Sequence, residues 1–440
     1  MGALLSSMAA SMIGLALPSI SADLAIPLDQ AEWIMLSFLL AVTVMLLVAG
    51  RLSDLLGHRQ VFVAGYFLFG LTSLLCGLAQ DFFFLVAARL LQGISGAMIM
   101  ATGVALLTTS FPADRRGWAL GMISTATYAG LTAGPSLGGA LIAAFGWRAI
   151  FLINLPISAA LIVLSIVFLP YVRPPKKFSL DIGGLILLMT SLPLVMLALS
   201  RGQQWGWHSW PTLASGAVGA LLLAGFIRTE LKIPEPLLDL SLFRSRIFTG
   251  AAFSALFNYV SLFIPTFLLP YYLTEGRHIP YSQAGLILAA QPIAMALIAG
   301  ISGRLSDRIG TRPLAVAGLI ILGLGLFGLS TVGPQTIRAV TATWLAVIGL
   351  GTGIFVSPNS SSLMGAAPRH EQGVAAGVLA VARNTGMMLG ITSATVLFHA
   401  AGGRVGGDWS AAEFAALRIA FVAAACISLV GASTSALRGK

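Results

Sequence analysis

Gly50-Arg51-Leu52-Ser53-Asp54 is a stretch that occurs twice in this chain, because residues 303–307 repeat it letter for letter and end at Asp307. Each copy continues to a glycine and an arginine, Gly57 and Arg59 in the first and Gly310 and Arg312 in the second. A second echo follows further on, where Pro112, Gly117 and Gly121 recur as Pro368, Gly373 and Gly377. Two echoes in the same order indicate two related halves in parallel orientation.

The composition places these halves in a membrane. The 440 residues are 57% hydrophobic and only 9% charged, with a mean hydropathy of +0.93. A soluble globular chain would carry about 25% charged residues. A spanning helix takes about 20 apolar residues, so with short loops the chain has room for roughly fourteen spans. Little is left for a soluble domain, which excludes a pump with its own nucleotide-binding domain and a receptor with an ectodomain.

Apolar runs bounded by charged or turn residues predict an all-α membrane protein with fourteen transmembrane helices. They lie at residues 2–20, 32–51, 60–79, 82–109, 116–144, 147–170, 181–200, 211–229, 247–273, 281–303, 313–332, 338–363, 372–400 and 414–437. The repeated stretches follow the second and tenth helices, which predicts two six-helix halves plus two inserted helices. We expect an N-terminal half over residues 1–170, a linker with the inserted pair over 171–240, and a C-terminal half over 241–440.

The distribution of basic residues predicts the orientation. One set of alternate loops and the C-terminus holds Arg51, Arg59, Arg115, Arg116, Arg173, Lys176, Lys177, Arg228, Lys232, Arg244, Arg246, Arg304, Arg308, Arg312, Arg369, Arg438 and Lys440. Short cytoplasmic loops collect Lys and Arg, so both termini are expected in the cytoplasm, with the chain in the inner membrane of a bacterium. The net charge of +10 then mostly faces anionic lipid. No nucleic-acid partner is expected, because the charges are divided among short loops.

Parallel six-helix repeats are the plan of major facilitator transporters. Residues 50–59 resemble the cytoplasmic loop motif of that superfamily, Gly-x-Leu-x-Asp-x-x-Gly-x-Arg, and Arg89 with Gln92 resembles its second motif. A further stretch is similar to the motif that marks antiporters and contains Gly130, Gly134, Pro135, Gly138 and Gly139. With Trp147 and Arg148 and the fourteen-helix layout, the whole chain resembles the drug:proton antiporters of the EmrB/QacA type. The resemblance implies the major facilitator fold.

The resemblance also implies roles for two motifs. Asp54 would lock the halves together when the inside is closed, and Asp307 would either do the same in the second copy or cap a helix. A helix cap without gating is the structural alternative for both. Glycines 130, 134 and 138 recur every four residues and so form one smooth stripe, which allows helices to approach closely. The resemblance adds that this stripe lies at the interface between the halves and restricts leak.

Two arginines are predicted inside the membrane, where charged side chains are costly and usually functional. Arg89 lies about 10 Å from the outer end of its helix and Arg383 about 17 Å from the inner end of its own. The resemblance links Arg89 to proton transfer, and bonding of exposed carbonyls is the structural alternative for both. No acid lies near a predicted helix centre. The family usually has an aspartate in its first helix, but Ala9 stands at that position here. Arginine stays protonated, so the best candidates for a proton carrier are Glu32 and Asp23 at the outer mouth.

Three functions remain open. The family resemblance favours export of small amphipathic drugs in exchange for protons by alternating access. An anionic amphiphile or lipid is the alternative cargo, exported or flipped with weak or no proton coupling, since two embedded arginines without an embedded acid leave net positive charge. A non-transporting receptor on a transporter scaffold is the third. A substrate pocket would be apolar with a few polar anchors, and its expected lining is Phe38, Asn258, Tyr259, Gln291, Phe355 and Asn359.

No enzyme chemistry is predicted. The five histidines are scattered, and Cys76 and Cys426 lie in separate apolar runs, so no catalytic set, metal site or cofactor is expected. Residues 323–328 match the dinucleotide fingerprint GxGxxG but lie inside a membrane helix, which favours helix packing. We expect the protein to function as a monomer surrounded by membrane lipids.

Overall fold

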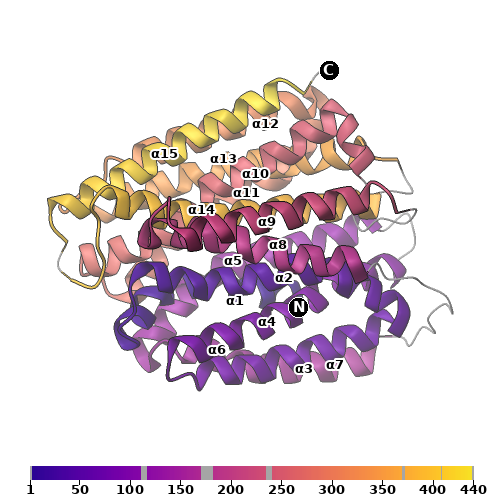
Figure 1. The fold of residues 1–440 in the computed structure, drawn as a ribbon, viewed down its shortest axis with the longest axis horizontal. Helices are drawn as coiled ribbons and strands as arrows, with labels where there is room; N and C mark the ends of the chain where they lie inside the picture. The colour runs from indigo at the N-terminus through magenta and orange to yellow at the C-terminus, as the bar shows by residue number, and fades with distance from the viewer. Residues whose placement is uncertain are drawn as a thin grey trace. The chain divides into compact units, whose positions relative to one another are not determined.

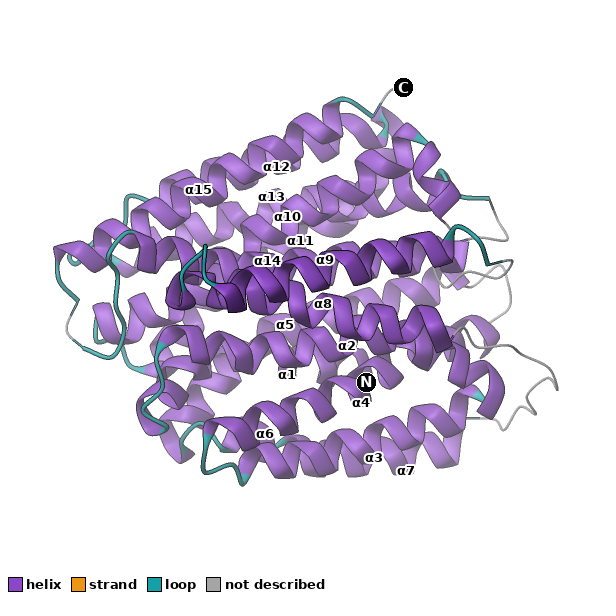
Figure 2. Cartoon of the chain, in the orientation of Figure 1, coloured by secondary structure: helices purple, strands orange, loops and turns teal. Residues whose placement is uncertain are grey.

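The computed structural model describes residues 2–110, 116–169, 182–233, 240–368, 372–407 and 409–438. Within these ranges every regular element is a helix and no strand is present (Figure 2). The helices up to residue 168 are α1 (Gly2–Asp23), α2 (Leu28–Leu56), α3 (His58–Gly77), α4 (Phe82–Ser110), α5 (Arg116–Phe145), α6 (Ala149–Leu152) and α7 (Asn154–Phe168). The others are α8 (Ile182–Trp205), α9 (Trp210–Glu230), η1 (Leu240–Arg244), α10 (Arg246–Tyr271), η2 (Tyr272–Gly276), α11 (Tyr281–Ile309), α12 (Thr311–Leu329), α13 (Arg338–Gly365), α14 (Gln372–Ala400) and α15 (Ala411–Ala436).

The helices are long enough to span a bilayer, as predicted. Thirteen stretches of the described chain are both long and apolar enough to cross a membrane, and α8 contains a shorter apolar stretch, Ile186–Gly202. The chain is therefore an all-α, integral, multi-pass membrane protein. The predicted all-helical class is confirmed.

Several helices extend beyond their predicted ends. The second helix was predicted over residues 32–51, but α2 starts at Leu28, after Pro27 in an extended conformation, and ends at Leu56. Its first turn holds Asp29, a favourable place for a carboxylate because the helix N-terminus is positive. The charges after residue 50 were assigned to a loop, but they lie on continuing helix. Likewise α11 reaches Ile309 instead of residue 303.

The sixth predicted helix, over residues 147–170, is divided in two. A turn at Ile153 separates α6 from α7. Pro156 lies in the first turn of α7, where its missing N–H costs no helical hydrogen bond. The Asn154 side chain donates to the carbonyl O of Ile150 across the turn, at 3.4 Å. Ile153 itself keeps helical dihedral angles, with φ of −62° and ψ of −22°, so α6 and α7 follow one helical path that is interrupted just before the proline.

The chain divides into two compact units. Unit 1 comprises Met1–Leu180 and Ile279–Ala289, and unit 2 comprises Asp181–His278 and Ala290–Lys440. The inserted helices α8 and α9 thus belong to unit 2, where α8 packs against α9 and α14. The first turns of α11 belong to unit 1.

The two units pair their helices in the same way, as the sequence repeat predicts. In unit 1, α1 packs along α5, and α3 packs along both α4 and α7 (Figure 1). In unit 2, α10 packs along α14, and α12 packs along both α13 and α15. The order of these pairs along the chain is the same in both units, so the repeat extends from the short motif to the architecture.

Close backbone contact at glycine holds the α12–α13 pair. A Cβ atom added to Gly351 would lie 2.4 Å from the backbone N of Leu322 and 2.7 Å from the carbonyl O of Gly318. A Cβ on Gly318 would lie 2.7 Å from both the carbonyl O of Gly351 and the backbone N of Phe355. These separations are impossible for real Cβ atoms, so only glycine permits this approach.

Gly351→Ala is expected to destabilise unit 2, because the added methyl group forces α12 and α13 apart; overpacking typically costs about 1–3 kcal/mol. The matched control is Gly300→Ala in α11, where no atom lies within 4 Å of the added Cβ. Alanine favours helix there, so this variant should unfold at the wild-type temperature or above. Thermal unfolding of the two purified variants in detergent measures the difference in their stability. Equal unfolding midpoints for the two variants would contradict the claim that only glycine permits the close approach of α12 and α13.

Candidate functional site

Both copies of the repeated stretch form the same turn between two helices. Gly57 follows α2 with φ of 98°, and Gly310 follows α11 with φ of 89°, a backbone conformation that glycine adopts without strain. The N–H of each glycine donates to the carbonyl O four residues earlier, Ser53 at 2.9 Å and Ser306 at 3.0 Å. The hydroxyl of each serine donates to the glycine three residues before it, at 2.6 Å for Gly50 and 2.7 Å for Gly303.

The two arginines that end the motif differ in their contacts. Arg59 donates from Nη2 to the carbonyl O of Ile166 near the end of α7, at 2.7 Å. A guanidinium at a helix C-terminus satisfies a carbonyl and interacts favourably with the helix dipole. In the second copy, Asp307 and Arg312 are both exposed. The side chain of Asp54, predicted as a gating residue, lies outside the described part of the structure.

The glycine stripe of α5 packs against α1. A Cβ on Gly130 would lie 2.3 Å from the carbonyl O of Leu4, and one on Gly134 would lie 2.9 Å from the carbonyl O of Met8. The third glycine, Gly138, approaches the side chain of Met12. The first two glycines therefore bring backbone against backbone over one turn, and the third packs against a side chain.

A second face of the same motif packs against the start of α11, within unit 1. A Cβ on Gly139 would lie 2.3 Å from the carbonyl O of Tyr281, and one on Gly285 would lie 2.1 Å from the carbonyl O of Pro135. The motif therefore has two packing faces. Spacing by four residues predicted the first, whereas the second depends on Gly285, which is distant in sequence and gave no signal.

Arg89 is almost completely buried, with 5% of its surface exposed. Its Nε donates to the carbonyl O of Ile34 on α2 at 2.9 Å, and its Nη1 donates to Oε1 of Gln92 at 2.6 Å. The guanidinium also lies 4.4 Å from the ring centroid of Phe38, close enough for a cation–π contact. Both hydrogen-bond acceptors are neutral, so Arg89 fixes a positive charge between α2 and α4.

Gln92 extends this arrangement into a buried network. Its Nε2 donates to Oγ of Ser73 on α3 at 2.7 Å, and Nδ2 of Asn154 donates to the same hydroxyl at 3.4 Å. All four side chains are at most 5% exposed. A buried polar network fixes one arrangement of the helices, and in this one only Oδ1 of Asn154 has no hydrogen-bond partner among the described residues. Sequence reasoning missed Ser73, because one serine in an apolar helix resembles many others.

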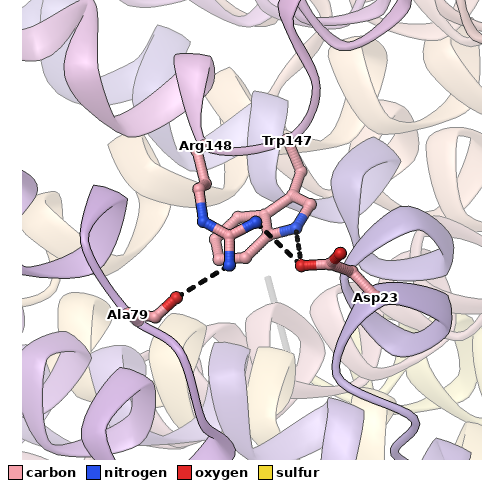
Figure 3. A network of polar contacts seen from close by, with 4 residues as sticks. All are labelled: Asp23, Ala79, Trp147 and Arg148. Atoms are coloured by element: carbon pink, nitrogen blue, oxygen red, sulfur yellow. Dashed lines mark hydrogen bonds and ion pairs between the residues drawn. The ribbon is translucent and has the colours of Figure 1, made fainter.

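Asp23 lies in a cluster that joins the ends of α1, α3 and α6 (Figure 3). Its Oδ2 accepts from Nη1 of Arg148 at 2.8 Å and from Nε1 of Trp147 at 3.0 Å. Arg148 also donates to the carbonyl O of Ala79 at 3.0 Å. The ring of Trp147 packs edge-on against Phe151, which is 6.0 Å from the Arg89 guanidinium. Asp23 is therefore partly exposed and engaged as a structural ion pair.

Two other acids of this region are buried. Asp29 and Glu32, one turn apart at the start of α2, are 2% and 0% exposed. A carboxylate away from water is costly to keep charged. Glu32 also lies two residues from Ile34, whose carbonyl accepts from Arg89.

The expected pocket residues are divided between the units. Phe38 belongs to unit 1, whereas Asn258, Tyr259, Gln291, Phe355 and Asn359 belong to unit 2. Phe355 packs on Gly318, and Asn359 donates to the carbonyl O of Ala251 at 3.1 Å and accepts from Arg438. Tyr259 and Gln291 are half-buried, and Asn258 is completely buried. Among the described residues, no group of three His, Cys, Asp or Glu side chains could hold a metal ion.

Gln92→Leu is expected to destabilise unit 1, because it removes the acceptor of a buried guanidinium and the donor to Ser73. An unsatisfied buried polar group costs about 1–3 kcal/mol, and more when it is charged. The control is Gln335→Leu, at an exposed position outside the helices of unit 2. Thermal unfolding in detergent measures both, and a Gln92→Leu midpoint at or above that of the control would show that the network is not stabilising.

Comparison with known proteins gives the family. The profile of the Major Facilitator Superfamily matches residues 1–248 and 251–437. The chain is 31% identical to the riboflavin transporter RibZ of Clostridioides difficile over 390 residues, 88% of this chain and 84% of the relative. It is 31% identical to the tetracenomycin C resistance and export protein of Streptomyces glaucescens over 416 residues, 94% of this chain and 77% of the relative. It is 32% identical to the methylenomycin A resistance protein of Streptomyces coelicolor over 428 residues, 96% and 88% of the two chains.

Solved structures show the same fold at low sequence identity. The nucleoside transporter NupG matches with a TM-score of 0.66 and 13% identity, over 100% of this chain and 99% of the other. A peptide transporter of the POT family matches with a TM-score of 0.68 and 16% identity, over 99% and 96% of the two chains. The repeated helix pairs, the matching profile and the transporter relatives agree, and the chain belongs to the Major Facilitator Superfamily of membrane transporters.

Proposed function

We propose that this transporter exports small amphipathic compounds in exchange for protons, by alternating access across the inner membrane of a bacterium. The relatives named for resistance to or export of tetracenomycin C and methylenomycin A support an exporter. The observation that carries the proposal is the packing of the α5 motif, whose glycines contact α1 on one face and the start of α11 on the other.

This packing suits exchange. An exchanger must deny protons a continuous path through the protein, because a leak would dissipate the gradient that drives export. Backbone contact at Gly130 and Gly134 leaves no side-chain-sized gap between α1 and α5. Contact at Gly139 and Gly285 does the same between α5 and the first turns of α11. Pro135 removes one helical hydrogen bond next to these contacts, so α5 can bend there without unpacking.

Glu32 is the proton carrier in this proposal. It is completely buried, whereas Asp23 is held as an ion pair by Arg148 and shares its carboxylate with Trp147. Proton binding removes the charge of a buried carboxylate such as Glu32, and this greatly changes the free energy of burying it. Protonation of Asp23 would only weaken its partly exposed ion pair with Arg148. Arg89 is anchored to the carbonyl O of Ile34, two residues along α2 from Glu32.

The remaining elements follow the sequence-based expectations. In unit 2, the substrate pocket includes the weakly polar residues Tyr259 and Gln291, which are both half-buried. Both termini are cytoplasmic, the basic loops face anionic lipid, and the monomer is the functional form. Asp54 locks the halves together while the cytoplasmic side is closed, and Asp307 either does the same in the second copy or caps a helix.

Gly134→Val is expected to abolish most transport with little effect on membrane insertion, because the side chain meets backbone on α1; overpacking costs about 1–3 kcal/mol. The control is Gly103→Val in α4, where an added Cβ meets a single side-chain atom at 3.9 Å. Efflux of ethidium, an amphipathic dye, from cells with matched protein levels is the measurement. Normal efflux by Gly134→Val would show that close packing of α5 against α1 is not required for transport.

Glu32→Gln is expected to abolish exchange, because it cannot take up or release a proton, while Asp23→Asn is expected to retain at least half of it. The loss of a partly exposed ion pair costs only about 0–1 kcal/mol. Proteoliposomes with an internal pH indicator, loaded with ethidium and given an imposed proton gradient, report both fluxes. The reverse result, with Asp23→Asn inactive and Glu32→Gln active, would assign the proton to Asp23, and coupling in both variants would place it elsewhere.

A further inference from the structure

The α10–α14 pair of unit 2 contains a cation, Arg383, that the described residues satisfy only in small part. Arg383 lies eleven residues after Gln372, the first residue of α14, about 17 Å along the helix axis. This distance places it near the middle of a hydrocarbon layer about 30 Å thick. Its guanidinium makes one long hydrogen bond, from Nε to Oδ1 of Asn384 at 3.5 Å. No described carboxylate forms an ion pair with it.

The half-buried state of Arg383 indicates what its open side faces. A guanidinium exposed to lipid at mid-depth is too costly to persist, so such a side chain faces protein or a water-filled space. Tyr259 on α10 is also half-buried. Gly386 lets the two helices approach closely at this level, since a Cβ there would lie 2.9 Å from Cβ of Tyr259. The open face thus combines a cation with an aromatic ring.

Unsatisfied amides lie on the same two helices. Asn384 is 3% exposed and Asn258 is completely buried. Among the described residues, Nδ2 of Asn384 and both amide atoms of Asn258 have no hydrogen-bond partner. Buried polar atoms without partners are rare, and in a membrane interior each costs several kcal/mol. They indicate hydrogen-bonding capacity that a polar ligand or water fills in another state of the transport cycle.

Arg89 and Arg383 differ in how far the protein satisfies their hydrogen-bonding capacity. Both arginines are embedded in the membrane, but Arg89 is enclosed, with two short hydrogen bonds and a ring at 4.4 Å. Arg89 is therefore complete within the protein and offers nothing to a ligand. Arg383 is half-buried, and among the described residues its one acceptor is Oδ1 of Asn384 at 3.5 Å, so most of its hydrogen-bonding capacity is open to an anion.

We infer that Arg383 and Tyr259, with the Asn384 and Asn258 amides, form a site for the anionic group of an amphipathic substrate, such as a carboxylate attached to an aromatic ring system. The guanidinium binds the carboxylate by charge-assisted hydrogen bonds. The phenol ring of Tyr259 contacts the apolar body. This inference rests on the proposed export function and specifies the charge of its substrate.

Equilibrium binding to the full-length protein in detergent tests the site. The probes are 1-pyrenebutyrate and its cationic analogue pyrenebutyl-trimethylammonium, which share the same ring system, and energy transfer from the tryptophans reports their binding. Wild-type protein is expected to bind the anion at least about tenfold more tightly than the cation, which corresponds to about 1.4 kcal/mol. Arg383→Gln should remove this preference, and Arg383→Lys should keep most of it.

Two further variants keep the test decisive. Asn384→Asp leaves Arg383 in place but puts a carboxylate beside it, so it should weaken anion binding at least about tenfold even where Arg383→Gln does not fold. Arg404→Gln, at an exposed position between α14 and α15, should change neither affinity. Equal affinity of wild-type protein for the two probes, absence of binding by both, or unchanged anion preference in Arg383→Gln would overturn the site.

Transport separates this inference from the proposed function. Proton-coupled efflux of ethidium without an Arg383-dependent preference for the anion would overturn the anion site and leave the exporter intact. Arg383-dependent binding of pyrenebutyrate without any proton flux in proteoliposomes would support the site and overturn proton exchange.

Discussion

Contact between helix backbones at glycine is the constraint on which the rest of this structure depends. Lipid is as apolar as the side chains, so no hydrophobic force draws two spanning helices together, and close packing must do so. Gly351 and Gly318 each approach the other's carbonyl on α12 and α13, and Gly139 and Gly285 approach carbonyls across α5 and α11. These contacts set the distance between helices and thereby decide which polar side chains become enclosed.

The fold could be predicted from the sequence because apolar length is a local property. Repetition of residues 50–54 at 303–307 then gave the relation between the halves, and the same helix pairs occur in both units. The ends of helices were less predictable. Hydropathy stops at the membrane surface, whereas α2 continues through charged residues to Leu56 and ends only where Gly57 adopts a positive φ.

The candidate site was only partly predictable, because its contacts join residues far apart in sequence. An embedded arginine is visible at position 89, but nothing near it indicates that Ile34 and Gln92 accept its hydrogen bonds. Similarly, nothing near Asp23 in the sequence indicates that Arg148, 125 residues away, donates to its carboxylate at 2.8 Å. The sequence places Glu32 and Asp23 in the same region but does not indicate their burial. In the structure Glu32 is enclosed and Asp23 is partly exposed.

The two copies of the repeated turn preserve their shape but not their partners. In both, a glycine with positive φ ends the helix and a serine hydroxyl binds the carbonyl three residues earlier. The arginine that follows is committed to the end of α7 in the first copy and is exposed in the second. The first copy therefore ties α3 to the end of α7, whereas the second leaves its arginine at the surface, so the same sequence motif contributes differently to stability in the two units.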